Sequence, residues 1–241
     1  MKISVVVPVH NETENVATLI DEIHRALNDQ EAYEMIFVDD GSTDDTLLKL
    51  KQLMPDYPTL RVLHHQSSCG QSRAAHSGVV AAKYDWIATL DGDGQNDPAD
   101  IPNLIAARNQ HNSENLWLLT GFRHQRHDTP WRRFSSKFAN TVRGAILRDN
   151  TPDTGCGLKL FRRDKFLALP YFDHIHRFLP ALMQMAGGEI ISIKVKHRAR
   201  CHGQSKYGTL DRLLAGVMDL LGVIWLQHRH SLPVVSEVNH E

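Results

Sequence analysis

The chain has 241 residues and a nearly balanced charge, with 27 lysines and arginines against 28 aspartates and glutamates. A chain of this length can bury a sizeable core as one large domain, and its charge balance gives no reason to expect nucleic acid as a partner. Its three cysteines are widely separated. They fit neither a disulfide framework nor a paired metal motif, so we expect a reducing compartment.

The first half of the chain alternates short apolar runs with amphipathic segments. This alternation predicts an α/β fold: a Rossmann-like, mostly parallel sheet with helices on both faces. The expected strands are residues 3–7, 35–38, 61–64, 86–90 and 116–120, and the expected helices are 15–28, 44–54, 71–82 and 101–109. In such folds, ligands bind beyond the carboxyl ends of the strands.

The pattern changes near residue 124, where a basic, histidine-rich stretch begins. After it we expect an amphipathic segment at 134–147, turns at 150–157, a helix at 177–186, a strand pair at 190–200 and an apolar helix at 210–226. A membrane-spanning helix needs roughly 20 apolar residues. The best candidate contains Asp211, Arg212 and Asp219, so the chain is not expected to cross a membrane by itself.

Three of the expected strands end in polar turns that carry carboxylates. Glu12 follows the first strand, Asp39 and Asp40 end the second, and Asp91 and Asp93 follow the fourth. Because the carboxyl ends of parallel strands meet on one rim, we expect these turns to converge. An acidic rim would repel a diphosphate unless a divalent cation lay between them.

The turn at 91–95 is the strongest candidate for a metal site. Asp91 and Asp93 alternate with glycines, which let the backbone approach a ligand, and Gln95 adds a neutral oxygen. Such oxygen ligands select Mg²⁺ or Mn²⁺ over softer metals. A plain turn is the alternative, since Asp-Gly pairs are common in turns. A calcium-binding EF-hand loop is excluded because its twelfth position falls on Pro102.

With these motifs the chain resembles the family-2 glycosyltransferases of the dolichyl-phosphate mannosyltransferase type, which include bacterial enzymes that glycosylate undecaprenyl phosphate. The resemblance covers nearly the whole chain and rests on ordered motifs at 8–12, 38–44, 91–98 and 202–208. It implies a GT-A type fold and an inverting transfer of a sugar from a nucleotide-sugar to a polyprenyl phosphate. The chain is then one domain, 1–241, with a nucleotide-sugar-binding half at 1–122, an acceptor half at 123–208 and an apolar helix with a tail at 209–241.

The resemblance also implies roles for individual residues. The nucleotide-sugar is expected at Pro8, Asn11, Glu12, Asp39, Asp40, Asp91 and Gly92. The Mg²⁺ or Mn²⁺ ion is expected at Asp91, Asp93 and Gln95. His10 stands where related sequences more often have tyrosine, which leaves the nucleotide base open.

Basic residues in the second half suit the phosphate of an acceptor, because arginine makes bidentate contacts to phosphate oxygens. The family resemblance places the acceptor phosphate at Arg123, Arg132 and Ser136, and a solvated basic loop is the alternative. Arg200 and Lys206 flank a loop of small residues. With Asp93, they are the expected catalytic groups and would stabilise the departing diphosphate. The histidines near this loop lack the spacing of a zinc site.

The class of acceptor is inferred from the absence of the sequence motifs that mark a general base. A phosphate monoester is already nucleophilic at neutral pH, whereas a hydroxyl acceptor needs a base. Family-2 enzymes that act on hydroxyls typically carry a Glu-Asp pair, and polymerising ones add a Gln-x-x-Arg-Trp motif. Neither occurs in this sequence. Polyprenyl phosphate is therefore favoured, and Asp153 stays open as a base, an orienting group or a turn residue.

Other functions remain as alternatives to this interpretation. One is a glycosyltransferase that acts on a sugar hydroxyl, and another is a non-catalytic nucleotide-sugar-binding partner. A nucleotidyltransferase is disfavoured because no glycine-rich basic loop follows the first expected strand.

A lipid acceptor requires access to a bilayer. The helix at 210–226 is expected either to lie along the membrane interface, with Trp225 at headgroup depth, or to pack in the core or in a homo-oligomer. We expect a cytoplasmic protein, peripheral on the cytoplasmic face of the inner membrane. It would dock on the membrane surface or on a separate membrane protein partner and would serve cell-envelope glycan synthesis or lipid A modification.

Overall fold

The computed structural model describes residues 1–111, 113–123, 144, 146–147, 149, 151–199, 209–233 and 236, with the backbone alone at 209–215. The expected amphipathic segment at 134–147 lies almost wholly outside these residues. Four of the expected site residues also lie outside them: Arg132, Ser136, Arg200 and Lys206.

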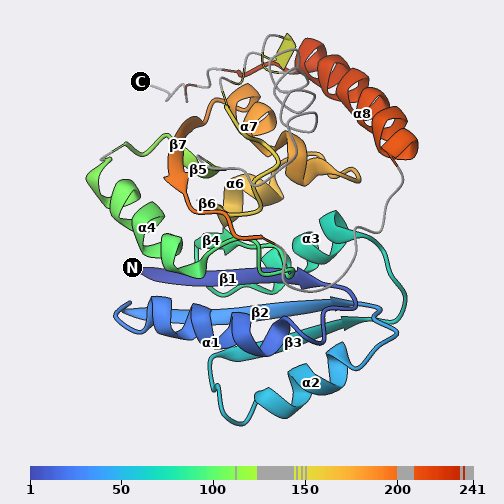
Figure 1. Cartoon of the computed structure of the whole chain (residues 1–241). Coiled ribbons are helices and arrows are strands. Elements are labelled where there is room, and N and C mark those ends of the chain that lie inside the picture. The colour runs from blue at the N-terminus through green and yellow to red at the C-terminus, as the bar shows by residue number, and fades with distance from the viewer. Residues whose placement is uncertain are drawn as a thin grey trace.

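Within the described residues, the strands form one seven-stranded sheet in the order β3-β2-β1-β4-β6-β5-β7 (Figure 1). The strands are β1 (Lys2–Val9), β2 (Ala32–Asp40), β3 (Leu60–His65), β4 (Trp86–Thr89), β5 (Leu116–Arg123), β6 (Lys159–Arg162) and β7 (Glu189–Val195). β6 runs antiparallel to β4 and β5, and the other neighbouring pairs are parallel. The carboxyl ends of six strands and the amino end of β6 therefore meet at one edge of the sheet.

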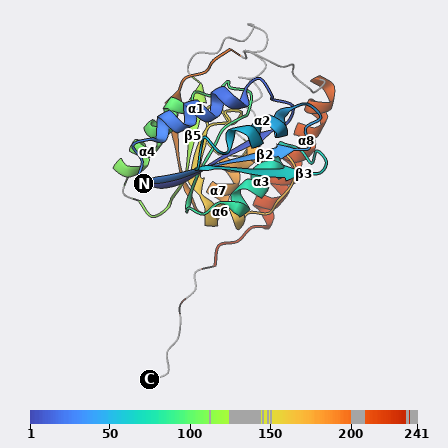
Figure 2. The ribbon, with the colours of Figure 1, turned by 90° about the horizontal axis from the view of Figure 1, so that it is seen from below.

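Helices cover both faces of the sheet (Figure 2). One face carries α1 (Val16–Leu27), α2 (Thr46–Leu53) and α4 (Ile101–Gln110), and the other carries α3 (Gln71–Ala81), α6 (Arg163–Leu167), α7 (Ile175–Met185) and α8 (Thr209–Arg229). A short 3₁₀ helix, η1 (Pro98–Asp100), precedes α4. In α1 the buried apolar residues 16, 19, 20, 23 and 27 recur at helical spacing, so one apolar side of the helix packs against the sheet.

The strands are buried on both faces, as a sheet covered by two layers of helices requires. In β1, Val5 and Val7 belong to the apolar core beneath α1, whereas Val6 belongs to the core beneath α3 and α7. The same alternation applies at the end of β2. Asp39 and Asp40 are consecutive strand residues, so their side chains point to opposite faces.

The predicted α/β order of the first half is confirmed: β1, β2, β3 and β5 extend a few residues beyond the predicted ends, and β4 is one residue shorter than predicted. The strand pair expected at 190–200 is wrong. One strand, β7, ends at Val195 and pairs in parallel with β5, and within the described residues 196–199 an isolated bridge joins His197 to Asn96. Because β7 pairs with β5, a strand distant in sequence, the described residues 189–199 contain no hairpin.

Candidate functional site

The carboxylate-bearing turns do converge, because six strands share one direction. The turns after β1, β2 and β4 lie at the same edge as the end of β5, the turn before β6 and the segment after β7. The last segment is tied directly to the turn after β4. The backbone N–H of Arg198 donates to the Gln95 carbonyl at 2.9 Å, and that of Lys196 donates to Asp100 at 2.6 Å.

The turns that follow β1 and β2 are joined to each other by hydrogen bonds. Asn11 has a left-handed backbone with φ of 56°, which asparagine tolerates better than most residues. Its N–H donates to Ser42 Oγ at 2.9 Å, and its Oδ1 accepts from the N–H of Thr43 at 2.8 Å. His10 Nδ1 lies 2.8 Å from the Asp40 carbonyl. These contacts fix the place of the expected nucleoside-binding turns.

Glu12 and Pro8 lie at the same edge. The carboxylate of Glu12 accepts from Asn15 Nδ2 at 2.6 Å, and its backbone N–H donates to Thr46 Oγ1 at 2.8 Å. Pro8 is half-buried, lies one residue before the end of β1 and lines a cavity beside Asp91. Glu12 is therefore held at the starts of α1 and α2, and Pro8 lies opposite Val38 in the register of β1 and β2.

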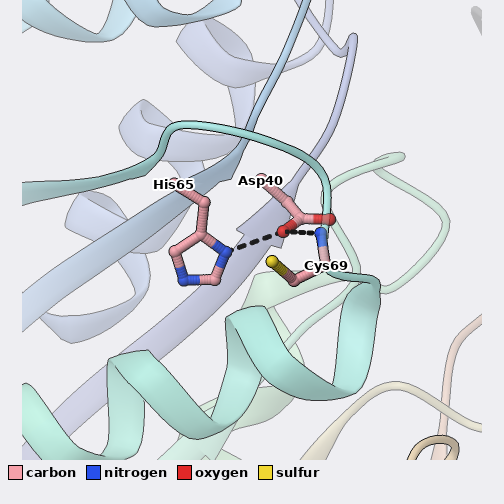
Figure 3. A group of neighbouring side chains, drawn as sticks. All are labelled: Asp40, His65 and Cys69. Carbon is pink, nitrogen blue, oxygen red and sulfur yellow. Dashed lines mark hydrogen bonds and ion pairs between the residues drawn. The ribbon is translucent and has the colours of Figure 1, made fainter.

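Asp40 is held by a dense set of hydrogen bonds (Figure 3). Its Oδ1 lies 2.7 Å from His65 Nδ1 and accepts from the N–H of Cys69 at 2.9 Å, and its Oδ2 accepts from Ser68 Oγ at 2.7 Å and the N–H of Gly70 at 2.8 Å. Burial opposes ionisation, but these hydrogen bonds outweigh it and lower the pKa of Asp40. Asp40 thus anchors the turn that begins α3.

Asp40, His65 and Cys69 also form a group that could hold a metal by distance alone (Figure 3). A thiol, an imidazole and one carboxylate suit a softer ion such as Zn²⁺, not Mg²⁺ or Mn²⁺. The available atoms are already used, because His65 Nδ1 contacts Asp40 and His65 Nε2 lies 3.0 Å from Ser77 Oγ. The geometry supports a structural anchor for the turn.

Asp39 points to the opposite face from Asp40 and is completely buried. Its Oδ2 lies 2.7 Å from His64 Nδ1, and its Oδ1 has no hydrogen-bond partner among the described residues. A buried carboxylate oxygen without a partner is costly, which makes this atom a candidate acceptor for a ligand N–H.

Asp91 is the central carboxylate of the site. It lies half-buried beyond β4, where its Oδ1 accepts from Gln71 Nε2 at 2.7 Å. Burial, and next the neighbouring carboxylate of Asp93, raise the pKa of Asp91 to about 6, although Lys159 acts in the opposite direction. A Cβ atom at Gly157 would lie 2.3 Å from Asp91 Oδ2, so glycine is needed there for Asp91 to keep its position.

The rest of the turn supports a hard metal ion. A Cβ atom at Gly92 would lie 2.6 Å from Val9 Cγ1, so the turn packs closely on β1. Asp93 Oδ1 accepts from the N–H of Gln95 at 3.1 Å, and the buried Oδ1 of Asn96 has no partner among the described residues. Asp91 and Asp93 lie close enough for the Asp93 carboxylate to raise the pKa of Asp91. Carboxylate and amide oxygens grouped in this way fit Mg²⁺ or Mn²⁺.

Arg123 is bound to Asp153 in a two-point contact. The Nε and Nη2 atoms of Arg123 donate to Asp153 Oδ2 and Oδ1 at 2.6 and 2.8 Å, and both side chains are largely buried. Asp153 therefore orients the guanidinium, and this contact favours the orienting role over that of a base. A Cβ atom at Gly155 would lie 3.2 Å from Arg123 Nη2, which keeps the adjacent turn close.

Sequence reasoning missed several residues that line this edge. Lys159 begins β6, and Gln71, Ser72 and His176 come from α3 and α7. The sequence did offer one signal for Lys159, because this lysine interrupts the apolar run 158–161. A lysine in such a run is expected to be buried, and a buried lysine is rare unless it is paired. His176 gave no signal, since a single histidine next to the expected helix 177–186 points to no particular role.

The sheet order, the glycine-spaced carboxylates and the position of the turns define the fold of nucleotide-sugar glycosyltransferases. Solved structures share it. Glucosyl-3-phosphoglycerate synthase from Mycobacterium tuberculosis, in complex with Mn²⁺, uridine diphosphate and glucosyl-3-phosphoglycerate, aligns with a TM-score of 0.68 at 21% identity over 94% of this chain and 79% of that one. A mannosyltransferase from Pyrobaculum calidifontis with GDP-mannose and Mn²⁺ aligns with a TM-score of 0.70 at 18% identity over 95% and 65%.

Sequence comparison gives the family. Residues 4–169 match the family described as Glycosyl transferase family 2, and the chain belongs to it. Dodecaprenyl-phosphate galacturonate synthase of Rhizobium johnstonii is 34% identical over 97% of this chain and 69% of its own length. Undecaprenyl-phosphate 4-deoxy-4-formamido-L-arabinose transferase of Proteus mirabilis is 31% identical over 98% and 72%. The expected family and fold are confirmed.

Proposed function

We propose that this protein is an inverting glycosyltransferase that moves a sugar from a nucleotide-sugar to a polyprenyl phosphate. The observation that carries the proposal is the pair Asp91 and Asp93 at the carboxyl end of β4, with the oriented guanidinium of Arg123 at the end of β5. Two relatives that align with nearly the whole chain are named for transfer to dodecaprenyl and undecaprenyl phosphate, which supports the same acceptor class.

In this proposal the donor lies across the edge of the sheet. The turn 8–12 and Asp39 and Asp40 hold the nucleoside, with the partnerless Oδ1 of Asp39 as an acceptor for an N–H of the base. Asp91, Asp93 and Gln95 would hold Mg²⁺ or Mn²⁺. When bound, such an ion neutralises charge on the departing diphosphate. Asp93, Arg200 and Lys206 complete the proposed catalytic set.

The acceptor approaches from the other side of the sugar. An oxygen of the lipid phosphate attacks the anomeric carbon, the bond to the diphosphate breaks, and the configuration inverts. The attacking phosphate is an anion at neutral pH and needs no base. Arg123, with Arg132 and Ser136, binds this phosphate, and Asp153 holds Arg123 in the orientation that a bidentate contact requires.

A lipid acceptor also needs a surface that meets the bilayer. In the part of the chain that the structure describes, no helix is long and apolar enough to cross a membrane. Among the described side chains of α8, four large apolar ones are nevertheless exposed: Val217, Met218, Leu221 and Trp225. Their spacing places them on one side of the helix, as in helices that lie in the membrane interface. We therefore propose a peripheral position at the cytoplasmic face of the inner membrane.

The test measures transfer of a labelled sugar to undecaprenyl phosphate in detergent with Mn²⁺. The wild type should form glycosylated lipid and release nucleoside diphosphate, not pyrophosphate. The variant Asp93→Ala should lose roughly 100-fold or more of the rate, as expected when a charge-stabilising group is removed. Asp56→Ala, at an exposed position after α2, is the control and should retain activity. Equal rates in all three proteins would refute the proposed roles.

A further inference from the structure

A cavity of about 40 Å³ lies beside Asp91, between α3, α7 and the start of β6. Its lining is mostly apolar, with Val79, Phe161, Phe166 and Leu179, and a smaller polar wall is formed by Gln71, Ser72, Asp91, Lys159 and His176. A water molecule needs about 10–15 Å³ of such space, so the cavity has room for roughly two or three heavy atoms. It is too small for a sugar ring and the right size for one substituent of a sugar.

The cation in this wall, Lys159, is only 4% exposed. Its ammonium donates to the carbonyl oxygens of Cys156 and Thr154, the latter at 3.5 Å, and it forms no ion pair with any carboxylate in the described parts of the chain. Burial lowers the pKa of Lys159, which the charges of Asp91 and Asp153 only partly oppose. A lysine this deeply buried is normally paired with an anion.

The neighbouring wall residues add neutral hydrogen-bonding groups. His176 Nδ1 lies 2.6 Å from Ser72 Oγ, which ties α7 to the beginning of α3. Burial, and next the charge of Lys159, lower the pKa of His176 well below its usual value, so the imidazole is neutral at neutral pH. The wall thus combines a buried ammonium, neutral polar groups and the Asp91 carboxylate, whose charge the proposed ion would neutralise. With that ion bound, a space of a few atoms beside a buried ammonium is suited to a carboxylate.

We infer that the donor sugar is a hexuronic acid, and that its C5 carboxylate enters this cavity and pairs with Lys159. The inference rests on the proposed function, because the sugar is attached directly to the diphosphate that Asp91 and its ion would hold. The comparisons leave the sugar undecided. One relative is named for galacturonate and another for a formamido-arabinose, a pentose whose C5 carries no carbon substituent. The buried cation favours the uronic acid.

Three donors with the same ring configuration separate these cases. UDP-galacturonic acid, UDP-galactose and UDP-L-arabinopyranose carry a carboxylate, a hydroxymethyl group and a hydrogen at C5. Their binding is measured by calorimetry with Mn²⁺ and without any acceptor. The wild type should bind UDP-galacturonic acid roughly 10- to 100-fold more tightly than the other two, as a charged hydrogen bond in a buried site predicts.

Lys159→Met tests the residue, because methionine keeps much of the volume and removes the charge. This variant should lose the preference and bind the three donors within a few-fold of one another, whereas Lys51→Met, at an exposed position of α2, should keep it. A variant that retains the preference would overturn the role of Lys159. The wild-type series decides the sugar class even if Lys159→Met does not fold. Equal binding of the three donors, or no binding of any, would overturn the inference.

The same donors, tested with undecaprenyl phosphate, separate this inference from the proposed function. Selective binding of UDP-galacturonic acid without transfer of any sugar to the lipid would support the cavity assignment and contradict the acceptor. Transfer of galactose or arabinose as fast as galacturonic acid would support the acceptor and contradict the cavity assignment.

Discussion

Gly157→Ala is the substitution whose effect follows most directly from the site geometry. The added Cβ atom would lie 2.3 Å from Asp91 Oδ2 and 2.7 Å from Asn96 Oδ1, well inside van der Waals contact. Asp91 must therefore move by about 1 Å, and a misplacement of that size at a reacting centre costs roughly 100-fold in rate. The fold should survive, because overpacking typically costs about 1–3 kcal/mol.

The assay is calorimetric titration of a nucleotide-sugar with Mn²⁺, together with the transfer rate, for Gly157→Ala and for the control Gly216→Ala. A Cβ atom at Gly216 meets nothing within 4 Å, so the control should bind and turn over like the wild type. Gly157→Ala should lose most Mn²⁺-dependent binding while its melting temperature falls only modestly. Wild-type binding and rate in Gly157→Ala would refute the reasoning that Asp91 holds the ion.

Three further predictions concern the pH response, the Arg123 contact and α8. Because the pKa of Asp91 is raised to about 6, Mn²⁺-dependent donor binding should weaken as pH falls through that value. The metal-free protein should lose stability as pH rises from 3.8, the ordinary pKa of aspartate, to about 6, and titration calorimetry with thermal melts across pH ~4–8 measures both effects. Asp153→Asn should raise the acceptor KM several-fold and leave the pH profile of kcat unchanged, since Asp153 orients Arg123; loss of the fall in kcat at low pH would mark a general base instead. Leu221→Asp should reduce sedimentation with anionic liposomes, and Leu48→Asp on α2 should not; equal sedimentation would exclude α8 as the contact.

Much of the fold was predictable because its cause is local and repeated. The apolar runs of β1 and β2 are buried on both sides, and the amphipathic spacing of α1 matches a helix that covers a sheet. β6 could not be predicted in this way. It is four residues long, and its antiparallel place between β4 and β5 depends on contacts with strands distant in sequence.

The candidate site was predictable where residue type alone selects the chemistry. Asp91, Asp93 and Gln95 indicated a hard metal ion, and their turn lies at the expected edge of the sheet. Side-chain direction was not predictable from the motif. Asp39 and Asp40 stand together in sequence but point to opposite faces, so Asp40 anchors the start of α3 while Asp39 keeps a buried oxygen without a partner among the described residues.

Lys159 shows the remaining limit most clearly. Its burial depends on β6 being the strand that brings the turn 153–157 against Asp91, and this arrangement appears only in three dimensions. The sequence offers just a lysine within an apolar run.

The central claim is that Asp91 and Asp93 support transfer of a sugar to a lipid phosphate. The most direct measurement follows a sugar-labelled donor in one reaction that contains undecaprenyl phosphate and an equal amount of undecaprenol, its hydroxyl analogue, with and without Mn²⁺. We predict label on the phosphate lipid alone, dependence on Mn²⁺, and loss of the product in Asp93→Ala. Label on undecaprenol, or hydrolysis of the donor with no labelled lipid, would contradict the account.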